Sequence, residues 1–145
     1  PQTPSTEWFE EQIEIFIKKI KEKTSAKIAI TTLPWLGEQE HASIIDVVKR
    51  HNNIIKRVAI KYDLTILDLF SRFSKQINSN YSVPYTTSEL RRFRGLRAVI
   101  LHYVFGWSWT KIGAKYNLKL LCDHIHLNER GGYLMENLVK EFLSN

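Results

Sequence analysis

The order of helical and extended segments is the feature that most restricts how this chain folds. Residues 6–23 and 40–62 repeat apolar side chains at spacings of three and four, which predicts two amphipathic helices. Each is followed by a short run rich in Ile, Leu and Thr, at residues 27–33 and 64–69, which predicts two buried strands. Helices that alternate with strands favour a parallel sheet, whose active site lies beyond the carboxyl ends of the strands. Because two strands alone make a poor sheet, we expect further strands from a preceding segment or from a partner.

Charged residues stand at the two ends of the first predicted helix as its dipole requires. Thr6 is the expected N-cap, and acidic residues such as Glu7 and Glu10 follow it near the positive end. Lysines from Lys18 to Lys23 stand near the negative end. One stripe is apolar and is expected to face the rest of the domain: Phe9, Ile13, Phe16, Ile17 and Ile20.

The second half of the chain has a less regular pattern. Residues 71–88 are polar with little periodicity, which indicates an exposed connection. Helices are predicted over residues 88–105 and 107–116, and an extended segment over residues 118–121. A final amphipathic helix is predicted over residues 129–143, with these side chains facing inward: Tyr133, Leu134, Leu138, Phe142 and Leu143.

Composition allows one packed domain and says little about location. Of the 145 residues, 43% are hydrophobic, and the formal charge of +6 is carried mostly by lysines that form solvated faces on predicted helices. The longest uncharged apolar stretch, residues 98–109, is too short to span a bilayer, so we expect no transmembrane segment. A start without methionine or signal peptide indicates a chain cut from a longer protein. The single Cys122 excludes an internal disulfide, and the sequence assigns no localisation.

The residues with catalytic potential lie between Cys122 and Tyr133. Asp123 precedes His126 by three residues, a spacing that allows contact within a turn just ahead of the final helix. A carboxylate beside an imidazole accepts its Nδ1 hydrogen, fixes the tautomer and leaves Nε2 free to act as a base. The same pattern is also typical of a loop in which the Asp caps local N–H groups and the His is an ordinary polar residue.

The residues around this pair are expected to have structural roles. Asn128 suits the N-cap of the final helix, because its side chain can accept from main-chain N–H groups there. We expect Gly131 and Gly132 to permit close packing, and His124 to be a surface neighbour.

Asp123-x-x-His126-Leu-Asn-x-x-Gly131 resembles the last conserved block of the SGNH (GDSL-type) hydrolases, a family of serine esterases. The stretch from Lys27 to Gly37 resembles the family's strand that ends in a Thr-x-Pro loop, and residues 64–69 resemble its next strand. The resemblance covers about two thirds of the chain. It implies that residues 1–145 are the C-terminal part of one three-layer, flavodoxin-like α/β domain, with a helical insertion over residues 71–117.

The resemblance also implies a serine ester hydrolase that works through a Ser-His-Asp triad, with His126 as general base and Asp123 as its orienting partner. The family's Gly-Asp-Ser turn, oxyanion-hole Gly and Gly-x-Asn-Asp block are absent from this sequence. No serine stands in a Gly-x-Ser-x-Gly elbow either. We therefore expect the nucleophile in the missing N-terminal half, no turnover by this chain alone, a small-molecule or lipid ester as substrate, and neither metal nor organic cofactor.

Two other site classes compete with the esterase interpretation. Cys122, Asp123, His124 and His126 are close enough in sequence to suggest zinc, but the sequence offers no second cluster of Cys and His ligands, so we expect no metal. Residues 90–118 resemble a helix-turn-helix, with four arginines available for phosphates: Arg91, Arg92, Arg94 and Arg97.

A nucleic-acid-binding module is therefore the alternative function, although it is less favoured. A helix-turn-helix needs a recognition helix after Asn117, whereas Leu118-Lys-Leu-Leu is apolar and runs straight into the Asp-His block. We instead expect the helical pair to pack over the site, as an acyl-binding wall or lid or as a purely structural insertion. Its predicted inner face consists of Phe93, Leu96, Val99, Ile100, Tyr103 and Trp107.

Overall fold

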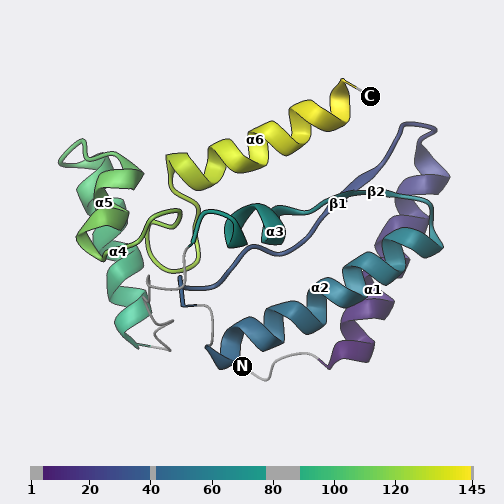
Figure 1. Cartoon of the computed structure of the whole chain (residues 1–145), viewed down its shortest axis with the longest axis horizontal. Coiled ribbons are helices and arrows are strands. Elements are labelled where there is room, and N and C mark those ends of the chain that lie inside the picture. The colour runs from purple at the N-terminus through teal and green to yellow at the C-terminus, as the bar shows by residue number, and fades with distance from the viewer. Residues whose placement is uncertain (1–4, 40–41, 78–88, 145) are drawn as a thin grey trace.

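Two short parallel strands form the centre of the chain (Figure 1). A computed structural model describes residues 5–39, 42–77 and 89–144. Strand β1 (Ala29–Thr31) pairs with β2 (Thr65–Leu67), with Ala29 opposite Thr65 and Thr31 opposite Leu67. Helix α2 (Ser43–Lys61) connects the two strands, which is the helical crossover that the sequence predicts. The other elements, in chain order, are α1 (Thr6–Lys23), α3 (Leu69–Ser74), α4 (Glu89–Tyr103), α5 (Trp109–Lys115) and α6 (Glu129–Leu143).

Helices cover both faces of the small sheet (Figure 1). Successive side chains of a strand point to opposite faces, so Ile30 and Leu67 lie on different sides. Ile30 packs against a buried cluster formed by α1 and α2, which includes Ile17 and Val58. Leu67 belongs to a second buried cluster that includes Leu138 of α6. The predicted α/β class is confirmed in this coarse form, as a mostly helical chain around a small parallel sheet.

The long terminal helices have the predicted bounds, whereas the strands are shorter than the predicted runs. The N-cap of α1 is Ser5 rather than Thr6, because the Ser5 hydroxyl accepts the main-chain N–H of Trp8 at 3.2 Å. In α6 the inward side of the helix is narrower than predicted. Leu138 is buried, but Tyr133 and Leu143 are exposed, because the strands and α3 reach only one side of this helix.

The prediction of an exposed connection from residue 71 is wrong for the part that the structure describes. Helix α3 occupies the start of this range, and both Phe73 and Ile77 are buried in the core. The Asp68 side chain caps α3 by accepting the N–H of Ser71 at 3.2 Å. A six-residue helix is too short to show an apolar repeat, so its packing was not visible in the sequence. Residues 78–88 lie outside the described part of the chain.

Buried polar side chains hold the chain at the carboxyl ends of both strands. The Thr32 hydroxyl donates to Asp68 Oδ1 at 3.1 Å and accepts the N–H of Phe70 at 2.9 Å. Burial raises the pKa of Asp68, but the hydrogen bonds from Lys56 and Ser71 lower it by more. The net pKa of Asp68 therefore lies below its usual value.

A second buried side chain fixes the direction of the loop that leaves β1. The amide of Asn52 accepts the main-chain N–H of Leu33 at 2.7 Å and donates to its C=O at 3.0 Å. Trp35, which follows in the same loop, is buried and donates from its indole to Ser74 Oγ at 3.2 Å. These bonds direct residues 33–38 towards the loop that contains Asp123 and His126.

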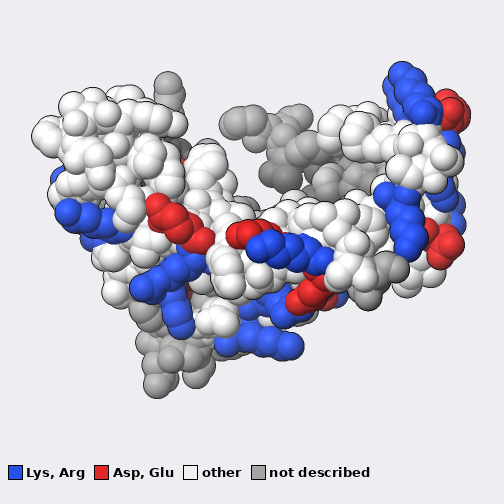
Figure 2. Space-filling model, turned by 90° about the horizontal axis from the view of Figure 1, so that it is seen from above, with Lys and Arg blue, Asp and Glu red and all other residues white. Residues whose placement is uncertain are grey.

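Charged side chains are distributed over the face shown in Figure 2, where Lys and Arg alternate with Asp and Glu. An ion pair from Arg72 of α3 to Glu141 connects α3 to α6, and a second pair, from Lys140 to Glu136, lies within α6. Such an arrangement is that of solvated helix faces. None of the helices in the described residues is long and apolar enough to cross a membrane.

Candidate active site

The loop between α5 and α6, residues 118–128, carries the predicted pair at its tip. Its stem is a short antiparallel contact in which the N–H of Cys122 donates to the C=O of His126 at 2.9 Å and that of Asn128 to Leu120 at 3.0 Å. Leu120 and Leu121 are buried, so the stem is part of the core. A loop anchored in this way can hold its tip in one conformation.

Asp123 and His126 are in direct contact. Asp123 Oδ2 lies 2.8 Å from His126 Nδ1, so the three-residue spacing does bring the two side chains together. The other carboxylate oxygen, Oδ1, accepts the main-chain N–H groups of Ile125 at 3.2 Å and His126 at 2.9 Å. Asp123 is only 5% exposed, whereas the imidazole is 73% exposed. The carboxylate is thus buried beneath a ring whose opposite edge is open.

Electrostatics keep the carboxylate of this pair ionised. Burial alone raises the pKa of Asp123, but the main-chain N–H and the imidazole of His126, with the N–H of Ile125, lower it more. The net pKa lies below the usual value for an Asp. An ionised carboxylate accepts from Nδ1–H, which leaves Nε2 as the unprotonated nitrogen of a neutral ring. This arrangement suits a general base.

A buried glutamate that the sequence analysis missed holds the stem of the loop. Glu38 is fully buried, and its Oε1 accepts the N–H groups of Leu120 at 2.7 Å and Leu121 at 3.0 Å. Its Oε2 accepts the N–H of Lys119 at 2.7 Å. The N–H of Gly37, whose φ is 69°, donates to the C=O of His124 at 2.8 Å. The sequence offers little sign of this role for Glu38. A Gly-Glu pair shortly after a predicted strand forms no periodic pattern from which burial could be predicted.

Two glycines let neighbouring helices touch the main chain of the stem. A Cβ atom on Gly113 of α5 would lie 2.2 Å from the C=O oxygen of Leu121, and one on Gly131 of α6 would lie 2.3 Å from that of Leu120. Close packing at Gly131 is therefore confirmed. The same prediction is wrong for Gly132. A Cβ atom there would meet no atom within 4 Å, because this side of α6 faces outward.

Asn128 performs the predicted capping role and a second one. Its Oδ1 accepts the N–H groups of Arg130 and Gly131, at 2.9 and 3.1 Å. Its Nδ2 also donates to the C=O groups of Lys119 and Leu121, at 3.1 and 3.2 Å. The same side chain therefore starts α6 and fixes the stem of the loop.

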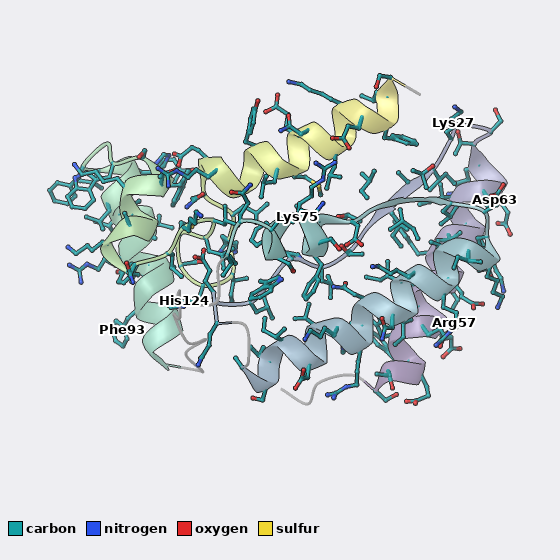
Figure 3. All side chains as sticks on the ribbon, viewed as in Figure 1. Lys27, Arg57, Asp63, Lys75, Phe93 and His124 are labelled. Atoms are coloured by element: carbon teal, nitrogen blue, oxygen red, sulfur yellow. The ribbon has the colours of Figure 1, made fainter. Side chains whose placement is uncertain are left out.

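His124 is not the surface neighbour that was predicted. Its side chain is 1% exposed and packs near Tyr116, within the loop beside α4 (Figure 3). The residue has a φ of 78°, in the left-handed region that a tight reversal requires. The reversal places one imidazole inside the loop and the other, that of His126, outside.

Helices α4 and α5 stand next to His126 and line an open, apolar cavity with it. The cavity has a volume of about 330 Å³ and is lined by Val99, Trp109, Cys122, His126 and Leu127. Burial, and next the charge of Asp123, raise the pKa of the Cys122 thiol to about 12. Cys122 is therefore a neutral part of the wall at ordinary pH rather than a thiolate nucleophile.

The predicted inner face of the helical pair is mostly exposed, which corrects the sequence analysis. Phe93 is 74% exposed and points away from the rest of the chain in Figure 3. Leu96, Ile100 and Tyr103 are exposed as well. Helix α4 approaches the loop instead through small residues. Ala98 is buried, and a Cβ on Gly95 would lie 3.6 Å from Asp123 Oδ2. Large apolar residues were a poor guide because small ones allow the closer approach.

The structure also bears on the two other kinds of site, a metal site and a helix-turn-helix. Among the described residues, no group of three or more His, Cys, Asp or Glu side chains is placed to hold a metal ion. Helix α5 is followed by a mostly buried loop over residues 118–121 rather than by a helix, and this loop bends at residues 119 and 120 instead of forming the predicted extended segment. The side chains of Arg91, Arg92 and Arg94 lie outside the described part of the chain.

Comparison with protein-family models gives no match for this chain, and comparison with curated proteins gives none either. The functional argument therefore rests on the geometry of the Asp123–His126 pair and on the motif in which it stands.

Proposed function

We propose that this chain is the C-terminal part of an SGNH-type serine ester hydrolase and supplies the Asp and His of its triad. The observation that supports the proposal most is the pair itself. Asp123 is buried and ionised, accepts the Nδ1 hydrogen of His126 at 2.8 Å, and is fixed by two main-chain N–H groups. The ring remains 73% exposed, so a group outside these residues can reach Nε2.

In the proposed reaction His126 moves the proton and Asp123 keeps it positioned to do so. Nε2 accepts the hydroxyl proton of a serine as the serine oxygen attacks the ester carbonyl, and then donates it to the departing alkoxide. Water hydrolyses the acyl-serine by the same proton path in reverse. Asp123 holds the Nδ1–H tautomer and stabilises the imidazolium that forms in each half of the reaction.

We further propose that a segment preceding Pro1 supplies the serine and extends the sheet. The bonds between β1 and β2 run from Thr65 N–H to the C=O of Ile28, and from Thr32 N–H to the C=O of Leu67. Alternate residues of a strand direct their N–H and C=O groups to opposite edges. Ala29 and Thr31 thus face the other edge of β1, which pairs with no strand in the described residues. A parallel strand on that edge would end near the Asp-His loop.

The decisive experiment is labelling by a fluorophosphonate, which reacts with activated serines. It uses the natural protein, including any sequence that precedes Pro1. Wild type is expected to be labelled, His126→Ala to lose labelling, and Asp123→Asn to be slowed by about 10⁴-fold because its ring takes the wrong tautomer. His51→Ala is the matched control, since His51 lies on α2, where its ring bonds to the C=O of Val47 and packs against Phe9 of α1. A folded wild type without labelling, or a His126→Ala variant labelled as fast as wild type, would overturn the proposal.

A further inference from the structure

The apolar cavity beside His126 indicates which part of an ester this site accepts. We propose that it binds an aliphatic chain of the substrate, so that the enzyme is selective for esters with a hydrocarbon chain rather than for small or polar esters. The inference rests on the proposed function, because it is His126 that connects the cavity to the reaction.

The lining of the cavity excludes charged and strongly polar groups. Apart from His126 its walls are the side chains of Val99, Trp109, Leu127 and the neutral thiol of Cys122. A polar group placed there loses its bonds to water and gains none from these side chains, which costs free energy. A methylene chain has no such loss and gains contact area.

A second cavity differs from the first because charged side chains form part of its lining. It has a volume of about 730 Å³, lies between α3 and α6, and is lined by charged groups that include Arg72, Lys119, Glu129 and Arg130. Of these two cavities, only the smaller one, which has no Lys, Arg, Asp or Glu in its lining, includes His126. The selectivity therefore follows from the cavity that the candidate base itself lines.

The wall of the apolar cavity is fixed before any substrate arrives. The Trp109 ring stacks on His102, with ring centroids 4.0 Å apart and planes inclined by 19°. The main-chain N–H of Trp109 donates to Glu129 at 2.7 Å, and the same carboxylate accepts the N–H and hydroxyl of Thr110. Glu129 directly follows Asn128, which caps α6 and bonds to the loop stem. A wall tied to the catalytic loop in this way loses little entropy on binding.

The surface around the cavity is apolar too, which suits a chain longer than the cavity holds. Tyr103 lies one turn after Val99 on the same side of α4, and Val104 and Phe105 follow it; all three are exposed.

The test measures how turnover by the natural full-length protein depends on chain length. One series of p-nitrophenyl esters lengthens the acyl chain, and one series of alkyl acetates lengthens the alcohol. We expect kcat/KM to rise about fourfold per added methylene until the cavity is full, which corresponds to about 0.8 kcal/mol for each. A rise in the first series assigns the cavity to the acyl chain, and a rise in the second assigns it to the alcohol; either supports the inference.

Two variants of one cavity residue connect the rise to the cavity. Val99→Trp fills the space and is expected to abolish the rise with chain length. Val99→Thr keeps nearly the same shape but adds a hydroxyl, and is expected to reduce the rise; Val99 is 47% exposed, so neither change disturbs a buried core. Phe93→Ala is the matched control, because Phe93 is an exposed apolar residue of the same helix that does not line the cavity.

The outcomes separate this inference from the function on which it rests. A protein that is not labelled by fluorophosphonate and hydrolyses no ester contradicts the proposed function. A labelled, active protein whose kcat/KM is independent of chain length in both series overturns the inference alone, as would be found if another part of the protein filled the cavity. The inference is also overturned if Val99→Trp and Val99→Thr keep the wild-type profile.

Discussion

Polar side chains tie distant segments together in two regions of this molecule, in very different surroundings. Between α1 and α2, Arg57 pairs with Glu10 and Lys61 with Glu14 at the surface. At the Asp-His loop, the carboxylate of Glu38 is fully buried and accepts main-chain N–H groups. Water can replace the partners of the first region but cannot reach those of the second. The comparison predicts that losing a partner matters little between the helices and greatly at the loop.

The buried polar bonds at the Asp-His loop also bear on the proposed function. The exposed imidazole of His126 must hold one orientation although the residues that carry it form a loop. The bonds of Glu38 and Asn128 to the stem supply the rigidity that a helix or strand would otherwise give. Buried polar groups are therefore concentrated where the proposed chemistry needs precision.

Replacing Glu38 is expected to have the largest effect on stability. In Glu38→Ala the N–H groups of Lys119, Leu120 and Leu121 lose their acceptor inside the protein. We expect the free energy of unfolding to fall by about 3 kcal/mol or more, because each buried unsatisfied donor costs about 1–3 kcal/mol. Urea unfolding followed by tryptophan fluorescence measures the loss, since Trp35 is buried in the same cluster as Leu120 and Leu121.

Glu38→Gln is the control for this change. It keeps one acceptor oxygen and nearly the same shape, so it should lose less stability than Glu38→Ala. If both variants unfold at the wild-type urea concentration, the carboxylate does not hold the stem, and the contrast between the two regions is lost.

The next largest effects are expected at the glycines that touch the stem. Gly113→Ala and Gly131→Ala each place a methyl group within 2.3 Å of a main-chain oxygen, so helix or loop must move. We expect each to lower the free energy of unfolding by about 1–3 kcal/mol, the usual cost of overpacking. Gly132→Ala is the matched control in the same helix. Its methyl group meets nothing, and the change should stabilise by up to about 1 kcal/mol through helix propensity. Equal effects at all three positions would contradict the close packing of the stem.

How far the sequence predicted these features depends on how local each one is. The bounds of α1 and α6 and the cap by Asn128 followed from spacing and from side-chain chemistry within a few residues. The contact between Asp123 and His126 was equally local. The partners of Glu38 lie more than eighty residues away in sequence, so no local pattern could show them.

Two wrong predictions have a common cause, the use of residue type as a guide to burial. His124 was placed at the surface and Phe93 inside, whereas the structure has them the other way round. A positive φ at His124 and a small-residue contact at Gly95 decide these positions, and neither can be read from hydrophobicity. The serine of the proposed triad is expected outside residues 1–145, because no serine of these residues stands in a nucleophile motif.

A smaller effect is expected from the ionisation of Asp123. The folded state holds the pKa of this carboxyl below its ordinary value, which is about 3.9 in an unfolded chain. The ionised group therefore contributes stability above about pH 4, and that contribution is lost as the pH falls through the folded-state pKa. The stability difference between wild type and Asp123→Asn should thus be larger at pH 7 than at pH 3. Urea unfolding at the two pH values measures it; a difference that grows on acidification would contradict the sign of the pKa shift.

The smallest effect on stability is expected at the surface ion pairs between α1 and α2. Arg57 donates from Nε to Glu10 at 3.0 Å, but both side chains are in contact with water. Arg57→Ala should leave the urea midpoint close to that of wild type, because solvent screens the pair and ordering two long side chains offsets much of the attraction. The apolar contacts of Ile17, Ile54 and Val58 beneath the pair should keep the helices together. A loss as large as that of Glu38→Ala would mean that surface ion pairs, and not this apolar cluster, hold α1 on α2.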